Sequence, residues 1–272
     1  MPEPYRHVVG AIVAAVADAD GPWRLVDSLH GWAERTPWCD WLELAGSLAR
    51  DAGDAWSDVD AGVGVVLDGV AYTARRDDVL AAVRGFAAVA DELIQPLGTD
   101  ERPADHLVLQ YEDGRQLSVV VMAAEDRSGL PPGARALFDR SGRLSRESAP
   151  PVVRATDEQR REWAFLAWWS LADVAKHAGR GRLWRALESL HEARTHAWRL
   201  YVAAAGVDYP LFGVVSAENA GLPGPAGMAS TVPASVAAPS IRAAGSALAG
   251  VLEPLTSGFG VDGVRAHARS RL

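Results

Sequence analysis

The chain has a single cysteine, a single lysine and no long apolar run. Cys39 stands alone among 272 residues, which excludes an internal disulfide and a zinc site built from four thiolates. We expect Cys39 to be a small buried apolar side chain. No stretch approaches the ~20 apolar residues of a membrane helix. The N-terminal apolar run lacks a preceding basic region, so we expect no signal peptide and a cytoplasmic protein.

Positive charge is also scarce. The formal net charge is -8, with 27 Lys and Arg against 35 Asp and Glu. A negative field repels phosphate backbones, which argues against nucleic-acid binding and suits a cationic small molecule better. Lys176 is the only lysine. Because a lysine ammonium is a usual partner of a triphosphate, Lys176 is a candidate phosphate-binding residue, with chance as the alternative explanation.

The first part of the chain mixes helices and strands. Apolar residues with a period near 3.6 predict helices, over residues 5–17, 23–33 and 73–93. Alternation and valine enrichment predict strands, over 40–45 and 58–67. Gly62 and Gly64 in the second of these strands would allow a close approach to the backbone. Asp113-Gly114 is a strong hairpin turn signal between two further strands, 106–111 and 116–122.

The remaining sequence is predicted to be helical. Residues 141–155, which include Pro150-Pro151, are the best candidate domain boundary, so we predict domains at 1–150 and 151–272. Helices are expected beyond the boundary, over 157–178, 183–205 and 240–252. The charge-poor stretch 217–240 is rich in Gly, Pro, Ala and Ser and is expected to be a long loop or a mobile lid. Four tryptophans are expected to fill the helical core: Trp163, Trp168, Trp169 and Trp198.

One segment combines residue types suited to phosphate and metal binding. Ala45-Gly46-Ser47 is followed after ten residues by Asp58-Val59-Asp60. Glycine and a small hydroxyl at a strand-to-helix turn let backbone N–H groups and the hydroxyl approach phosphate oxygens. Two aspartates two apart on a strand point to the same face and can share divalent cations. The alternative is that both aspartates decorate an exposed strand, but Gly-Ser at this spacing favours the functional interpretation.

This arrangement resembles the DNA polymerase β-like nucleotidyltransferase superfamily, whose pattern is a hydrophobic residue, Gly and Gly/Ser, about ten residues, then Asp-x-Asp. It is most similar to the small-molecule nucleotidyltransferases of the aminoglycoside and lincosamide type, over about residues 5 to 205. The resemblance implies an α+β fold, in which a minimal nucleotidyltransferase domain, a mixed β-sheet with flanking helices, precedes a C-terminal helical bundle. It also implies that Gly46 and Ser47 contact the triphosphate while Asp58 and Asp60 hold Mg²⁺.

The sequence departs from the family pattern at one position. The resemblance places a third carboxylate on the strand after Asp113-Gly114, where this chain has Ser118. A neutral hydroxyl is a poor general base and adds no charge to hold a second cation. Four residues are candidate substitutes: Glu112, Asp173, His177 and Glu188. A single histidine such as His177 is more often a surface or packed residue than a base.

The leading hypothesis is an enzyme that moves a nucleoside monophosphate from a magnesium-bound NTP, ATP before the others, to a hydroxyl of a small antibiotic-like molecule, releasing pyrophosphate. In-line attack at the α-phosphorus would use Asp58, Asp60 and the Ser118 position, with Lys176 neutralising the departing pyrophosphate. Two alternatives stay open: a catalytically degenerate nucleotide or metabolite sensor, and an enzyme that nucleotidylates a protein. The sequence names neither the nucleotide nor the acceptor, and a homodimer is left open.

Overall fold

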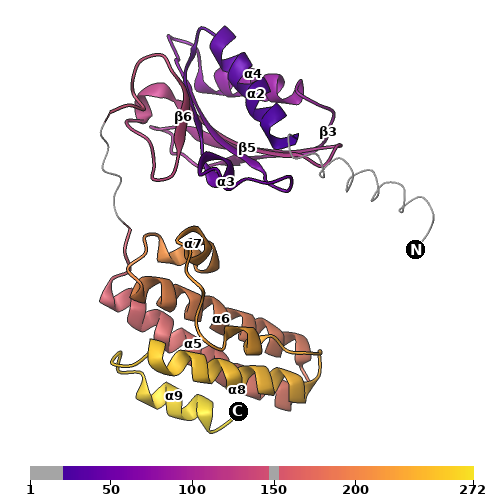
Figure 1. The fold of residues 1–272 in the computed structure, drawn as a ribbon, viewed down its shortest axis with the longest axis vertical. Helices are drawn as coiled ribbons and strands as arrows, with labels where there is room; N and C mark the ends of the chain where they lie inside the picture. Colours follow the sequence, from indigo (N-terminus) through magenta and orange to yellow (C-terminus); the bar gives the residue numbers. More distant parts are fainter. Residues whose placement is uncertain (1–20, 147–152) are drawn as a thin grey trace, which may run out of the picture. The chain divides into compact units, whose positions relative to one another are not determined.

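A computed structural model describes residues 21–146 and 153–272, which group into two compact units, residues 1–150 and 151–272. We call the first the sheet unit and the second the helical unit (Figure 1). Each has its own hydrophobic core. The helix predicted over residues 5–17 lies outside the described residues.

The sheet unit is built on one mixed sheet of six strands in the order β3-β4-β5-β2-β1-β6. The strands are β1 (Cys39–Leu44), β2 (Val59–Val65), β3 (Val89–Pro96), β4 (Ala104–Tyr111), β5 (Gln116–Ala123) and β6 (Arg135–Asp139). β2 and β5 pair in parallel, while the other neighbours pair antiparallel. The parallel pair sets Asp60 opposite Ser118. The predicted α+β class with a mixed sheet is confirmed.

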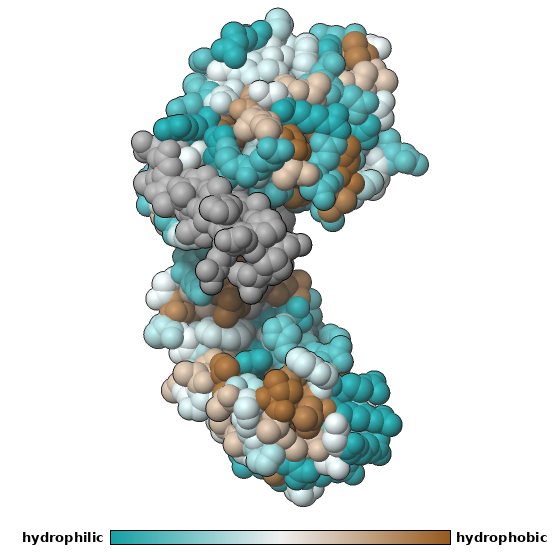
Figure 2. All heavy atoms as spheres, turned by 90° about the vertical axis from the view of Figure 1, so that its right-hand side faces the viewer, coloured by the Kyte–Doolittle hydropathy of each residue, from teal (hydrophilic) through white to brown (hydrophobic). Residues whose placement is uncertain are grey.

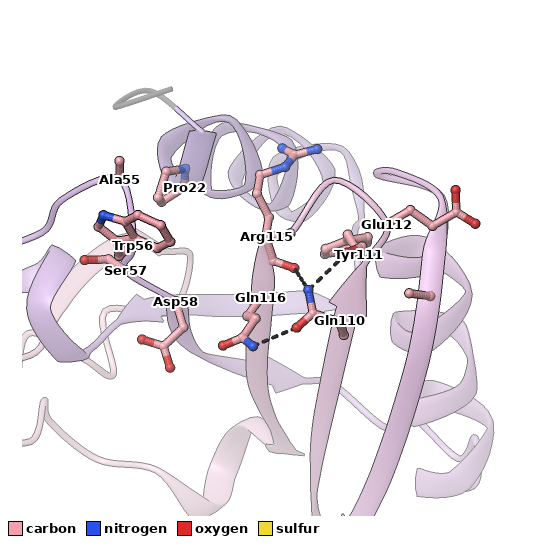
Figure 3. Close-up of a pocket in the computed structure, with 12 residues that line it drawn as sticks. Pro22, Ala55, Trp56, Ser57, Asp58, Gln110, Tyr111, Glu112, Arg115 and Gln116 are labelled. Carbon is pink, nitrogen blue, oxygen red and sulfur yellow. Dashed lines mark hydrogen bonds between the residues drawn. The ribbon is translucent and has the colours of Figure 1, made fainter. Parts of the chain in front are cut away.

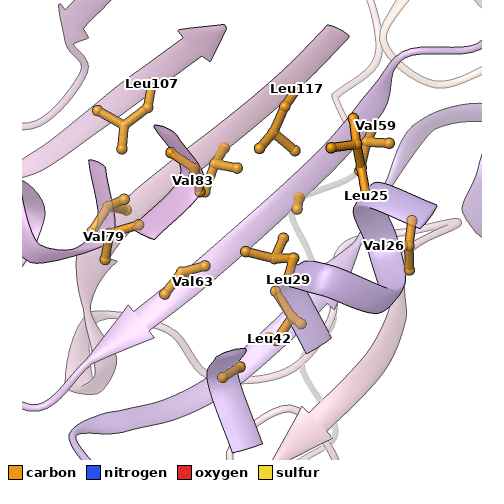
Figure 4. Packing of buried hydrophobic residues seen from close by; sticks show 14 of the residues in the cluster. Leu25, Val26, Leu29, Leu42, Val59, Val63, Val79, Val83, Leu107 and Leu117 are labelled. Carbon is orange, nitrogen blue, oxygen red and sulfur yellow. The ribbon is translucent and has the colours of Figure 1, made fainter. Parts of the chain in front are cut away.

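Two helices cover one face of this sheet. Figure 4 shows side chains of α2 (Gly21–Arg35) and α4 (Tyr72–Arg84) packed against side chains of the strands. Leu25 and Leu29 come from α2, Val79 and Val83 from α4, and Val63 and Leu117 from the sheet. In β4 and β5 every second residue is buried, and the residues between are half-buried apart from Gln116, which is exposed. Since successive side chains of a strand point to opposite faces, His106 and Ser118 lie on the face away from these helices.

The glycines of β2 allow close approach, as predicted. A Cβ on Gly64 would lie 2.1 Å from ring atoms of Trp41, and one on Gly62 would lie 2.7 Å from Oε1 of Glu43. Both neighbours come from β1 and are buried. The indole of Trp41 donates a hydrogen bond to the carbonyl of Ala124 at 3.2 Å. Glycine is therefore required here because side chains of the adjacent strand lie flat across β2.

The helix predicted over 73–93 is wrong beyond Arg84. Gly85 caps α4, and residues 89–96 form the edge strand β3, which pairs with β4 along its length. The apolar positions 86, 89 and 93 continue the helical period of the sequence. Leu93 nevertheless lies on the strand β3 and is 53% exposed. Backbone pairing with β4 outweighs the local periodicity. Strand β6 was also not predicted.

The helical unit contains α5 (Asp157–Gly179), α6 (Leu183–Ala204), α7 (Val214–Asn219), α8 (Ala238–Leu255) and α9 (Asp262–Arg269). The predicted helices over 157–178, 183–205 and 240–252 correspond to α5, α6 and α8. Thr156 begins α5 with a capping box shared with Gln159. The stretch 217–240 was expected to be a long loop, but it includes the end of α7, the short 3-10 helix η3 (Met228–Thr231) and the start of α8, with irregular residues between them. Its role as a lid stays a prediction. Helix α9 was missed.

The tryptophan prediction is partly wrong. Trp163 and Trp168 are buried in the helical core, and Trp198 is half-buried. Trp169 is 56% exposed because it neighbours Trp168 on α5 and so points to a different side of the helix. Within the described ranges, no helix combines the length and apolar character needed to cross a bilayer.

Candidate functional site

The turn after β1 packs directly against Asp60. The amide of Ala45 donates a 2.8 Å hydrogen bond to the carbonyl of Asp60, and Gly46 follows with φ +66°. A Cβ on Gly46 would lie 2.3 Å from Oδ2 of Asp60. Residues 46–49 form the short helix α3, whose first N–H groups have no partner within the helix. Backbone donors therefore lie beside the Asp60 carboxylate.

Asp58 and Asp60 place two negative charges near one another. Asp58 is exposed and directly precedes β2, whereas Asp60 is half-buried within it. Burial raises the pKa of the Asp60 carboxyl above its usual value of 3.8, and the charge of Asp58 raises it further. The pKa of Asp60 is lowered in part by three neighbours, Ser118, His106 and Arg50. A cation bound between the aspartates would relieve this repulsion.

Ser118 connects Asp60 to a histidine that the sequence analysis did not single out. Its hydroxyl acts to lower the pKa of the Asp60 carboxyl, and its Oγ lies 2.8 Å from Nε2 of His106 on β4. Either Oγ of Ser118 or Nε2 of His106 can be the donor of this bond, because the roles depend on the tautomer of the ring. Strand alternation across the predicted hairpin was the signal that could have found His106, since it shares a face with Ser118.

Ser47 links the turn after β1 to the loop before β2. Its hydroxyl donates to Oγ of Ser57 at 3.1 Å, and Ser57 in turn donates to Oδ1 of Asp54. Ser57 directly precedes Asp58. The structure therefore brings together five of the predicted residues, Gly46, Ser47, Asp58, Asp60 and Ser118, at one end of the parallel strand pair.

A pocket of about 410 Å³ adjoins Asp58 (Figure 3). Trp56, which is 69% exposed, lies on one side, and Gln116 donates a 2.7 Å hydrogen bond to Gln110 along another. Glu112 lies across the pocket from Asp58 and is exposed, so it does not complete a carboxylate cluster with the aspartates. A pocket of this size suits a base or a small acceptor.

The donor set fits one magnesium ion that arrives with a nucleotide. Within residues 21–146 and 153–272, no group of three or more His, Cys, Asp or Glu side chains could hold a metal. Mg²⁺ is usually held by one or two carboxylates together with substrate phosphates and water, which Asp58 and Asp60 satisfy. Ser118 supplies no charge for a second ion.

The other predicted residues belong to the helical unit. Lys176 forms an ion pair with Asp173 one turn earlier on α5. His177 is buried and its Nδ1 has no hydrogen-bond partner among the described residues, as expected of a packed histidine. Glu188 is exposed on α6. A role for any of them at the triphosphate stays a prediction.

No protein-family model matches the chain, and a search of curated proteins finds no match. Two solved structures are similar at low level. An aminoglycoside 6-adenyltransferase from Bacillus subtilis shares 12% identity over 92% of this chain and 97% of that chain, with a TM-score of 0.36. A nucleotidyltransferase-like protein from Exiguobacterium sibiricum 255-15 shares 14% identity over 84% of this chain and 74% of that chain, with a TM-score of 0.33. At these values the likeness decides neither fold nor activity, which rest on the residues themselves.

Proposed function

We propose that the chain is a nucleotidyltransferase that moves a nucleoside monophosphate from magnesium-bound NTP, with ATP as the first donor to test, to a hydroxyl of a small molecule. The sheet unit is the catalytic domain in this proposal. The observation that carries it is the contact between Gly46 and Asp60, which sets a turn whose first N–H groups have no partner within α3 against a carboxylate. Triphosphate oxygens and their metal ion need these two features side by side.

In this proposal the turn after β1 binds phosphate and the two aspartates bind the metal ion. The backbone of Gly46 and Ser47 and the hydroxyl of Ser47 bind the outer phosphates. Asp58 and Asp60 hold the magnesium ion, which when bound neutralises phosphate charge and polarises the α-phosphorus for in-line attack. Ser47 exchanges its hydrogen bond with Ser57 for one to phosphate. Lys176 is proposed to add a cation as pyrophosphate leaves.

His106 is proposed to accept the proton of the attacking hydroxyl in place of the missing carboxylate. In the tautomer whose Nε2–H donates to Ser118, the neutral ring has Nδ1 available as an acceptor. Ser118 is then a positioning residue, because it fixes the imidazole relative to Asp60. Imidazole is a better base near neutral pH than serine, which supports this division of roles.

The acceptor is proposed to be cationic and antibiotic-like. The net charge of -8 favours a positively charged small molecule. The pocket beside Asp58 has carboxylates on two sides, from Asp58 and Glu112, and the exposed indole of Trp56. These groups can bind ammonium groups and an apolar ring face, as an aminoglycoside or lincosamide presents.

The test is pyrophosphate release from each NTP with Mg²⁺ and a panel of aminoglycosides and lincosamides. Asp58→Asn and Asp60→Asn should abolish turnover. His106→Gln should lower kcat by roughly 10²–10⁴ while leaving KM for the nucleotide nearly unchanged. His30→Gln, which changes a partly exposed histidine of α2, is the matched control and should keep full activity. Full activity in both aspartate variants would refute the proposal.

A second candidate function is favoured by Ser118 itself. Without a third carboxylate, the protein would bind Mg–NTP as a sensor and transfer nothing. Nucleotide binding without pyrophosphate release, across all acceptors, would support this function. Ser118→Asp should then introduce a trace of turnover, because it adds charge for a second cation.

A further inference from the structure

A second pocket lies entirely within the helical unit, between α6 and residues 209–214. Its volume is about 320 Å³, which is enough for one small organic molecule. Apolar side chains form much of its wall: Trp198, Leu211, Phe212 and Val214. Phe212 is 65% exposed and Leu211 is 48% exposed. Apolar side chains also reach the surface of this unit in separate patches in Figure 2.

Arg194 on α6 lines the same pocket without a partner. The residue is half-buried, and its Nε is fully buried with no hydrogen bond. Among residues 21–146 and 153–272, no hydrogen bond, ion pair or ring contact to its guanidinium is found, and no carboxylate lines the pocket. Burial also lowers the pKa of Arg194. Removing a charge from water without a counter-charge is costly, so this arrangement favours an anionic ligand.

The wall opposite Arg194 is held in a fixed conformation. Tyr209 and Gly213 both have φ +55°, which brackets residues 210–212 with two left-handed positions. Arg199 donates a 3.1 Å hydrogen bond to the carbonyl of Leu211, and Ser216 donates a 2.7 Å bond to the carbonyl of Tyr209. These two hydrogen bonds hold the backbone of the segment that carries the exposed Leu211 and Phe212. Left-handed backbone conformations of non-glycine residues such as Tyr209 are concentrated at ligand sites.

We propose that this pocket binds a small aromatic carboxylate. The guanidinium of Arg194 pairs with the carboxylate through two parallel N–H donors, a geometry that lysine cannot supply. The aromatic ring of the ligand lies against Trp198 and Phe212, which accounts for the exposure of Phe212. His191 at the rim adds a further polar group. This proposal does not rest on the site formed by Asp58 and Asp60.

The probe is 2-naphthoate, compared with its neutral isostere 2-naphthamide by isothermal titration calorimetry on the full chain. We expect one saturable site for 2-naphthoate and at least about tenfold weaker binding of 2-naphthamide, because only the carboxylate satisfies Arg194. Arg194→Gln should weaken 2-naphthoate at least about tenfold and leave 2-naphthamide unchanged. Phe212→Ala should weaken both probes by similar factors.

Arg185→Gln is the matched control, since Arg185 is exposed on the same helix and outside the pocket. It should leave both affinities unchanged. Should Arg194→Gln lose its thermal unfolding transition, Arg194→Lys replaces it and should also weaken 2-naphthoate. Equal affinities for the two probes, undiminished 2-naphthoate binding in the folded Arg194 variant, or no binding of 2-naphthoate would each overturn the proposal.

Discussion

Gly46 stands so close to Asp60 that a Cβ on residue 46 would lie 2.3 Å from Oδ2 of the aspartate. Its φ of +66° adds conformational strain for any other residue. We predict that Gly46→Ala lowers the free energy of unfolding by about 1–3 kcal/mol and weakens Mg–NTP binding, because Asp60 must move. Thermal unfolding and nucleotide titration measure the two effects.

Gly69 provides the control for this prediction. It also has a left-handed backbone, φ +78°, but a Cβ there would meet nothing within 4 Å. Gly69→Ala should therefore lose only the conformational contribution, about 1 kcal/mol, and should bind nucleotide normally. Equal losses in both variants would mean that the contact with Asp60 has no energetic role.

The sequence was sufficient to predict the residues around Gly46 because their spacing is local. Asp58 directly precedes β2 and lies two residues before Asp60, so extended backbone gives both one face, and the turn glycine lies two residues after β1. His106 was missed because its contact with Ser118 depends on the register of two strands, which the sequence does not give. Only the pairing of β4 with β5 brings its ring to Ser118.

The fold was predicted least well where tertiary contacts override local pattern. Residues 89–96 carry a helical period but lie at the sheet edge, where β4 offers backbone hydrogen bonds. Helix α9 has only 8 residues, so its apolar positions, Val264 and Ala268, are too few to establish a helical period from the sequence. Arg194 likewise looks like an ordinary helix surface residue until residues 209–214 fold across it.

His196 makes stability depend on pH. Burial lowers its pKa to about 4, with the charge of Arg199 acting in the same direction. In the unfolded chain the imidazole takes up a proton near pH 6.5, whereas in the folded chain it does so only near pH 4. The free energy of unfolding therefore falls as the pH drops from about 6.5 to about 4. Between pH 7 and pH 5 the loss is about 2 kcal/mol. Thermal unfolding of His196→Gln should depend less on pH over this range, and identical pH profiles would contradict the assignment.

Cys39 should report unfolding of the sheet unit. Its side chain is fully buried in β1, and burial raises the pKa of its thiol to about 12. Because the thiolate is the reactive form, we expect no reaction with dithiodipyridine in the native protein and one equivalent after denaturation. Fast labelling under native conditions would show that β1 opens readily.

Asp58 and Asp60 are proposed to form the site for a magnesium-bound nucleotide. A thermal-shift titration with Mg²⁺ and each of ATP, GTP, CTP and UTP tests this proposal most directly, since a ligand at ~100 times its Kd stabilises a fold by about 2.7 kcal/mol. Asp100→Asn, which changes the same charge in an exposed loop, is the control. We predict stabilisation by at least one nucleotide in the unchanged protein and in Asp100→Asn, and its loss in Asp58→Asn and Asp60→Asn. Stabilisation by none of the four, or equal stabilisation in all variants, would contradict the proposal.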